Sequence, residues 1–159
     1  MVRNLYISNS KIHGEGVHTK KDYKKGDTLF IIKGTKKKWI VTNQEESLFG
    51  PDWIGVSKTV WIDPVGHAKY LNHSCNPNAG IKGKVTVVAL KDIKKGSEIT
   101  IDYSTTEIDT LWYMKCDCGE KNCRKTVRSI QSLPKEVFEK YSPYIPKYFM
   151  SIYNRANGK

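Results

Sequence analysis

Four cysteines are the residues whose spacing most restricts what chemistry the chain can do. Cys116, Cys118 and Cys123 form one cluster, and Cys75 lies far upstream of it. Four thiolates are the number that a tetrahedral zinc ion requires, at about 2.3 Å each. Gly119 would allow the sharp turn by which the last two cysteines could face one ion. The pattern predicts a zinc site. Unrelated buried thiols or disulfides remain the alternative, although cysteines separated by one residue bridge poorly and reducing compartments disfavour disulfides.

Three other short stretches carry groups that could bind a ligand or act on one. The stretch His13–Val17 contains two glycines, which would let a ligand approach the backbone closely. Asn72 and His73 offer an amide and an imidazole where neither strand nor helix periodicity is present. Tyr103 ends a β-rich run. Taken singly, each has a plainer interpretation: a turn between strands, a capped turn, and a buried aromatic ring at a strand end.

Short β-rich runs separated by turns must position these groups. The predicted strands are Leu5–Ile7, Val17–Thr19, Thr28–Ile32, Trp39–Thr42, Thr59–Ile62, Val85–Leu90 and Glu98–Tyr103. The stretch Glu45–Gly66 is less regular and has room for one short helix, and His67–Asn72 predicts a helical turn. Beyond the cysteines, one helix is predicted to begin within Ser132–Glu136 and a second after Pro146, each packing an aromatic face on the β domain.

A six-residue motif occurs twice. Lys21–Gly26 and Lys91–Gly96 share the pattern Lys-Asp-x-Lys-Lys-Gly, and each precedes an apolar strand. Gly26 and Gly96 are therefore predicted to take positive φ and close a tight turn. Two copies do not make a solenoid. They predict that the chain uses the same strand–turn–strand unit twice.

Four segments together resemble the SET-domain family of protein lysine methyltransferases. Tyr70–Asn78 is similar to the family's Asn-His-Ser-Cys-x-Pro-Asn signature, and Glu98–Tyr103 to its second signature, which ends in Asp-Tyr. Cys116–Arg124 resembles the post-SET segment, and His13–Val17 the Gly-x-Gly element. The segments follow one another in family order and spacing over about residues 3–128. Any one of them is weak, but the set is highly specific.

The resemblance implies a fold that is mostly β with α additions. It consists of small β-sheets around a knot-like active site, followed by a post-SET zinc segment and C-terminal helices. The implied division is a SET domain over residues 1–110, with a variable insert at 45–66, a zinc segment over 111–128 and a helical extension over 129–159.

The resemblance also implies an activity and the residues that carry it. The activity is methyl transfer from S-adenosylmethionine to the side-chain amine of a lysine in a protein, either a histone tail, the commonest family substrate, or a non-histone protein. The implied roles are catalysis for Tyr103, cofactor binding for Gly14, Glu15, Gly16, Asn72 and His73, and binding of one structural zinc for Cys75, Cys116, Cys118 and Cys123. The shared zinc site would explain the lone upstream cysteine.

The chain departs from the family pattern at the position two before the tyrosine. Ile101 stands where relatives often carry Phe or Tyr, and it predicts an apolar wall that permits transfer of more than one methyl group. The family's second channel tyrosine is not evident, and Glu45–Gly66 is expected to supply that wall. Trp112 and Met114 are expected to cover the cofactor or the lysine channel, with plain core packing as the alternative.

The chain has an excess of basic residues. Lys and Arg number 27 against 16 Asp and Glu, which gives a formal net charge of +11. This favours acidic partners, including DNA around a histone substrate. A non-catalytic basic zinc module that binds nucleic acid would explain the charge and the cysteines. It would not explain Asn72–His73 or Asp102–Tyr103, and the intact tyrosine also argues against an inactive SET scaffold.

Location follows from what the sequence lacks. No apolar run approaches the roughly 20 residues that span a bilayer, so no membrane partner is expected. The first residues lack the apolar core of a secretory signal. The default expectation is the cytoplasm or, if the substrate is a histone, the nucleus or export to a host cell.

Overall fold

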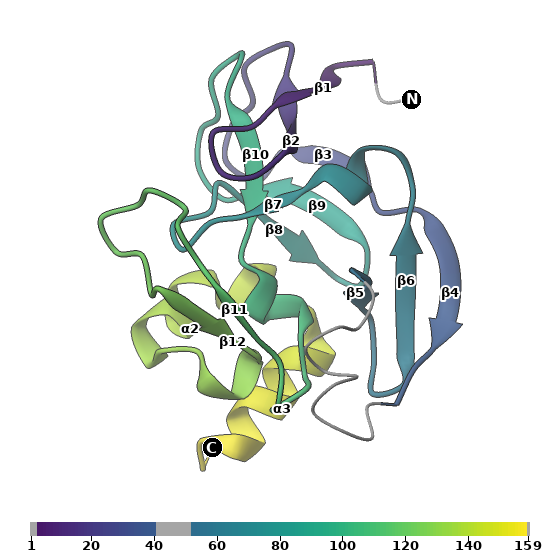
Figure 1. The fold of residues 1–159 in the computed structure, drawn as a ribbon, viewed down its shortest axis with the longest axis vertical. Coiled ribbons are helices and arrows are strands. Elements are labelled where there is room, and N and C mark those ends of the chain that lie inside the picture. Colours follow the sequence, from purple (N-terminus) through teal and green to yellow (C-terminus); the bar gives the residue numbers. More distant parts are fainter. Residues whose placement is uncertain (1–2, 41–51, 159) are drawn as a thin grey trace.

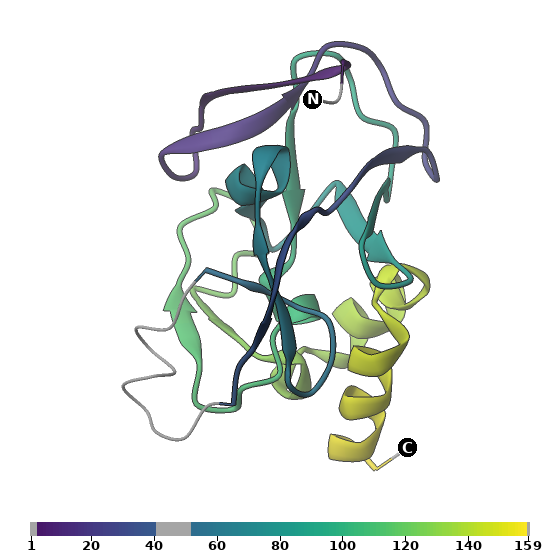
Figure 2. The same cartoon turned by 90° about the vertical axis from the view of Figure 1, so that its right-hand side faces the viewer.

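The computed structural model describes residues 3–40 and 52–158. Over these residues the chain folds into small β-sheets with two helices at the C-terminus, as predicted (Figures 1 and 2). The strands are β1 Leu5–Asn9, β2 Glu15–Thr19, β3 Thr28–Ile31, β4 Gly34–Lys38, β5 Ile54–Gly55, β6 Val60–Pro64, β7 Asn72–His73, β8 Ala79–Lys82, β9 Thr86–Ala89, β10 Glu98–Ile101, β11 Tyr113–Lys115 and β12 Thr126–Arg128. The α-helices are α2 Lys135–Tyr141 and α3 Lys147–Ala156, and the 3₁₀ helices are η1 Gly66–Tyr70, η2 Tyr103–Thr106, η3 Ile130–Ser132 and η4 Ser142–Tyr144.

The sheet of order β1-β2-β10-β7 joins the segments that carry the signatures. Strand β10 pairs antiparallel with β2 and parallel with β7. In the parallel pair, Thr100 lies opposite Asn72 and Ile101 lies opposite His73. The side chains of Val17, Ile99 and Ile101 are fully buried beneath this sheet and hold its register. The two signatures are therefore direct neighbours, although they are far apart in the sequence.

The two copies of the repeated motif pack against each other. Tyr23 and Ile93 form an antiparallel bridge in which each N–H donates to the other's carbonyl, at 2.8 and 2.9 Å. The strands before and after the first copy, β2 and β3, pair with β10 and β9, which flank the second. Gly26 and Gly96 have φ of 90° and 83°, which confirms the predicted turns. The same strand–turn–strand unit is used twice, as predicted, and the copies are paired.

The C-terminal helices have a core of their own. Pro134 and Pro146 immediately precede α2 and α3, positions where a proline costs no helical hydrogen bond. The rings of Phe138 and Tyr153 stack with centroids 3.7 Å apart, and Phe149 is fully buried. These aromatic faces confirm the predicted helices, which lie at the lower end of the molecule in Figure 1.

One expectation about local structure needs revision. The strand predicted at Trp39–Thr42 lies earlier, as β4 at Gly34–Lys38, because pairing with β6 rather than apolar content sets its position. Residues 41 and 42 lie outside the described residues. The short helix for which Glu45–Gly66 has room is not tested over residues 45–51, which also lie outside the described residues, and the described remainder contains β5 and β6. The helical turn predicted near His67–Asn72 is η1.

Among the described residues, no helix combines the length and apolar character needed to cross a membrane.

Candidate active site and four-cysteine centre

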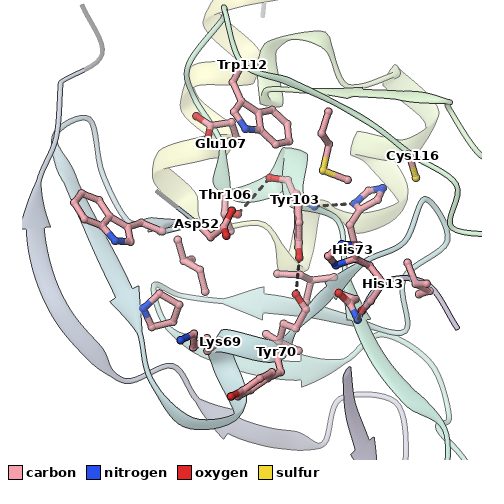
Figure 3. Close-up of a pocket in the computed structure, with 18 of the residues that line it drawn as sticks. His13, Asp52, Lys69, Tyr70, His73, Tyr103, Thr106, Glu107, Trp112 and Cys116 are labelled. Atoms are coloured by element: carbon pink, nitrogen blue, oxygen red, sulfur yellow. Dashed lines mark hydrogen bonds between the residues drawn. The ribbon is translucent and has the colours of Figure 1, made fainter. Parts of the chain in front are cut away.

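A cavity of about 720 Å³ lies between the β1-β2-β10-β7 sheet and the segment that follows η2 (Figure 3). Its lining brings together parts of the Gly-x-Gly element, both signatures and the cysteine segment. Of the residues with a predicted role, those that line it are Gly14, Glu15, Asn72, His73, Tyr103, Cys116 and Cys118. Those outside the lining are Gly16, Cys75 and Cys123.

Tyr103 is held at both its hydroxyl and its backbone. The hydroxyl donates a hydrogen bond to the carbonyl of Leu71 at 2.6 Å, and the backbone N–H donates to Nδ1 of His73 at 3.2 Å (Figure 3). Burial, with the negative charges of Asp52 and Glu98, raises the pKa of Tyr103 to about 12. The phenol therefore stays protonated near neutral pH and can act as a fixed hydrogen-bond donor.

Asn72 fastens the Gly-x-Gly loop to the sheet. Its amide nitrogen donates to the carbonyls of His13 and Glu15, at 3.1 and 3.0 Å, and to the Glu98 carboxylate at 2.8 Å. Gly14 between these carbonyls has φ of 48°, and a Cβ there would meet no atom within 4 Å. The loop thus presents bare backbone to the cavity, which is a suitable surface for a close-lying ligand.

Gly16 is glycine for a different reason. A Cβ at this position would collide with the Glu98 carboxylate, the same group that accepts from Asn72. Glu98 also accepts from the hydroxyl of Ser10 at 2.8 and 2.9 Å. The absence of a side chain at Gly16 makes room for this carboxylate rather than for a molecule in the cavity.

His73 connects the tyrosine to the cysteines. Because Nδ1 accepts from the Tyr103 backbone, Nε2 carries the proton and donates to Sγ of Cys75 at 3.3 Å. Burial lowers the pKa of His73 to about 4, although the charge of Asp102 opposes the shift. The imidazole is therefore neutral near neutral pH, and its tautomer is set by its two partners.

The four cysteine sulfurs lie together, all within 4.8 Å of one another, and all four are free thiols. In a tetrahedron with metal–sulfur bonds of about 2.3 Å the sulfurs are about 3.8 Å apart. The sulfurs of Cys75 and Cys116 are separated by 3.9 Å. Gly119, with φ of 76°, makes the predicted turn between the later cysteines. The donor set therefore fits a tetrahedral thiophilic ion such as zinc.

Asp102 and Arg124 are functional candidates that the sequence reasoning missed. Arg124 donates to Asp102 at 2.6 Å, and its backbone N–H and its Nε both donate to Sγ of Cys75, at 3.3 and 3.5 Å. The Asp102 side chain is 1% exposed and also accepts from the backbone of Ser104. Asp102 directly precedes Tyr103 in the sequence, and Arg124 directly follows Cys123. This adjacency to predicted site residues is the signal that could have identified both.

Other parts of the cavity wall are aromatic and apolar. Ile101 is 2% exposed and lies in the cavity lining, where an apolar wall was expected. Trp112 and Met114 also lie in the lining. The stretch Glu45–Gly66 contains no tyrosine, and its described part contributes tryptophans, Trp53 and Trp61, to the wall that it was expected to supply.

Acidic side chains in the lining outnumber lysines, in a chain whose overall charge is strongly positive. The acidic residues are Glu15, Asp52, Glu107, Asp109 and Asp117, and the lysines are Lys69 and Lys115. Burial raises the pKa of Glu107 to about 7, although the backbone N–H groups of Asp109 and Ile108 donate to its carboxylate. Sequence reasoning did not identify Glu107, since nothing local distinguishes it from a surface glutamate.

Histone-lysine methyltransferases are similar to this chain over most of its length. Over 137 residues it is 31% identical to Histone-lysine N-methyltransferase 2D of Homo sapiens, an alignment that covers 77% of this chain and 2% of the relative. Over 135 residues it is 28% identical to the H3 lysine-4 specific histone-lysine N-methyltransferase of Aspergillus oryzae, covering 74% of the chain and 11% of the relative. The chain thus spans only a small part of the length of these relatives.

Solved structures share the fold. KRYPTONITE in complex with mCHH DNA, an H3(1-15) peptide and SAH superposes with a TM-score of 0.60 at 22% identity, covering 78% of this chain and 29% of that one. A humanized mutant of the Chaetomium thermophilum Polycomb Repressive Complex 2 superposes with a TM-score of 0.56 at 18% identity, covering 69% and 16%. The family model described as the SET domain matches residues 14–104. The chain therefore belongs to the SET-domain family.

Proposed function

We propose that this chain transfers methyl groups from S-adenosylmethionine to the side-chain amine of a lysine in a protein, with histones as the substrate class and a nuclear role. The observation that carries the proposal is the position of Tyr103. Its protonated hydroxyl is fixed in a cavity that also contains the Gly-x-Gly loop and Asn72. Relatives named as histone-lysine methyltransferases support the same activity.

The cofactor would lie on the loop that Asn72 fastens. Gly14, Glu15, Asn72 and His73 are the proposed binding residues, and Gly16 contributes by accommodating Glu98. A cavity of about 720 Å³ is in the range that small-molecule sites occupy. KRYPTONITE, which shares the fold, was solved in complex with SAH, the demethylated product of this cofactor. When bound, the cofactor would supply a methyl group activated by the adjacent sulfonium.

Catalysis would rest on positioning and on exclusion of water. The walls formed by Ile101 and the tryptophans would disfavour the charged form of a lysine placed between them and so lower its pKa. Tyr103 would orient the resulting neutral amine through its hydroxyl. Alignment of amine and methyl in one enclosed site would account for most of the rate without a general base.

A structural zinc ion bound by Cys75, Cys116, Cys118 and Cys123 is part of the proposal. The separation of the sulfurs supports it, as do the hydrogen bonds that Arg124 and His73 donate to the sulfur of Cys75. Such donors to a ligand sulfur stabilise its charge and orient it. The ion would hold β11 and β12 so that Trp112 and Met114 cover the cavity.

The charge of the cavity supports a basic substrate segment. Five acidic residues against two lysines make the site locally attractive to cations, although the whole chain is not.

We also propose the division into a SET domain (1–110), a zinc segment (111–128) and a helical extension (129–159). Separate hydrophobic clusters support this division, one centred on the strands of the SET domain, one on the cysteines and the β11–β12 hairpin, and one on the C-terminal helices.

The test is a transfer assay with methyl-labelled cofactor on core histones and on a mixture of non-histone proteins. Label in histone lysines is expected, and it should be lost in the Tyr103→Phe variant. If the zinc-loaded protein labels neither mixture yet binds nucleic acid, the non-catalytic zinc module becomes the better account.

A further inference from the structure

The paired copies of the repeated motif form a basic surface that the proposed methyl transfer does not use. We define the double turn as residues 20–27 and 90–97, which lie side by side at the top of Figures 1 and 2. None of these residues lines the cavity. The double turn contains seven lysines, Lys20, Lys21, Lys24, Lys25, Lys91, Lys94 and Lys95, against three aspartates, Asp22, Asp27 and Asp92.

Each copy caps the other through its aspartate. Asp22 accepts from the backbone N–H of Lys95 at 2.8 Å, and Asp92 accepts from that of Lys25 at 3.0 Å. The ammonium of Lys94 also contacts Asp22, at 3.1 Å, and that of Lys24 contacts Asp92, at 2.8 Å. The aspartate of each copy thus accepts the same two contacts, one from a backbone N–H and one from an ammonium group. In the first case the ammonium belongs to the same copy as that N–H, and so it does in the second, so the two turns are held as one unit.

These contacts leave a symmetric pair of cations directed to solvent. Asp22 and Asp92 are occupied within the double turn, and the third aspartate, Asp27, accepts from the backbone N–H of Lys24. Within the described part of the chain, the ammonium groups of Lys25 and Lys95 have no side-chain partner, and both residues are exposed. The repeat therefore presents two equivalent free lysines on a fixed backbone.

We propose that the double turn binds the phosphate backbone of duplex nucleic acid, with Lys25 and Lys95 as the principal contacts. Lysine is a point charge suited to phosphate oxygens, whereas arginine or asparagine would be expected for reading bases. The apolar residues of the motif, Tyr23 and Ile93, are 5% and 2% exposed. They cannot stack on unpaired bases or insert into a bilayer, so neither single strands nor membranes are favoured.

The expected binding is independent of base sequence and depends strongly on salt. Each phosphate contact contributes about −0.9 to the slope of log K against log salt concentration. The Lys25→Gln/Lys95→Gln double variant should therefore lower the magnitude of that slope by about two, and the affinity at 0.1 M salt roughly tenfold or more. Fluorescence anisotropy with a labelled DNA duplex, over a series of salt concentrations, measures both.

A matched control separates the double turn from the net charge of the chain. Lys82→Gln/Lys84→Gln removes the same charge from exposed positions near the β8–β9 turn, at the opposite end of β9 from the double turn. This control should lose little affinity. Equal losses in the two double variants would overturn the proposal, as would absence of duplex binding by the wild type or tighter binding to vesicles of anionic phospholipid.

Methyl transfer to a free histone peptide should be unchanged in both double variants, because neither pair of lysines lines the cavity. Loss of duplex binding with intact peptide methylation would support the double turn as a separate surface. An inactive wild type that still binds duplex through Lys25 and Lys95 would refute the methyltransferase proposal and leave this one standing.

Discussion

Nε2 of His73 lies 3.3 Å from Sγ of Cys75 and donates to it, while Nδ1 of the same ring accepts the backbone N–H of Tyr103. One neutral imidazole thus joins the four-cysteine centre to the tyrosine proposed for catalysis. A shift of the Cys75 sulfur would be transmitted to the tyrosine backbone through a single buried ring. The four-cysteine centre and the proposed active site are therefore expected to be coupled.

We predict that the purified protein contains about one zinc ion per chain and that its removal destabilises the fold. Structural zinc contributes several kcal/mol to folding, and without it four thiols would remain crowded together. Elemental analysis, followed by thermal unfolding with and without a chelator, measures both effects. Protein that contains no metal and has two disulfides instead would rule out this assignment.

Arg124→Gln should destabilise the protein by about 3 kcal/mol, because it leaves the Asp102 carboxylate buried without its cationic partner. Arg124→Lys should be intermediate, since lysine keeps the charge but not the guanidinium geometry that also contacts Cys75. Urea unfolding gives the free energies. Arg128→Gln is the control, because Arg128 is exposed and should cost under about 1 kcal/mol. Equal effects at the two positions would mean that the buried pair has no special role.

Glu107 should make stability fall as the pH rises. Burial raises its pKa from 4.5 to about 7 in the folded state, so between these values the folded chain binds more protons than the unfolded chain. The free energy of unfolding then decreases across this window, by about 3 kcal/mol for a shift of this size. Glu107→Gln should therefore be more stable than the wild type at pH 8, with a smaller difference at pH 4.5.

Urea unfolding at several pH values tests the Glu107 prediction. Glu136→Gln, in the exposed first turn of α2, is the control and should change little with pH. A Glu107→Gln variant whose stability follows that of the wild type at every pH would show that the carboxylate is solvated.

Tyr103→Phe should lower the rate of methyl transfer by about a hundredfold or more, while cofactor binding stays close to that of the wild type. The change removes the hydroxyl that bonds to Leu71, which should cost about 1 kcal/mol of stability, but keeps the ring. Asn72→Ala should instead weaken cofactor binding, because it removes the two hydrogen bonds that hold the Gly-x-Gly loop and a third to the Glu98 carboxylate. Calorimetric titration with S-adenosylhomocysteine distinguishes the two classes. Full turnover by Tyr103→Phe would make Tyr103 a packing residue only.

We expect methyl transfer to continue beyond monomethyl-lysine to the di- or trimethyl state. Ile101 is buried, lines the cavity and has no hydrogen-bonding group, so it should not retain an ordered water beside the amine. The amine can then rotate and accept a second methyl group. Mass spectrometry of a peptide substrate at long reaction times should show di- or trimethyl product, and Ile101→Tyr should shift it toward monomethyl. A wild-type reaction that stops at one methyl with excess cofactor would show that another residue sets the limit.

Local features of the sequence were enough to predict much of this protein. The four cysteines, the glycine between them and the repeated turns were recognisable because metal ligation and positive φ restrict residue type at particular positions. The prolines and aromatic spacing predicted the C-terminal helices. The resemblance to SET domains depended on the order of four such segments, and it led to Tyr103, Asn72 and His73 before any contact was known.

Tertiary structure decided what depends on contacts between distant segments. The pairing of β7 with β10 brings His73 to Tyr103, and Arg124 reaches Asp102 only when the segment between β11 and β12 folds onto the SET domain. The requirement for glycine at Gly16 comes from Glu98, and the raised pKa of Glu107 comes from burial. Register, side-chain direction and desolvation are properties of the assembled fold. A local pattern determines which groups are present, but it does not determine which of them meet.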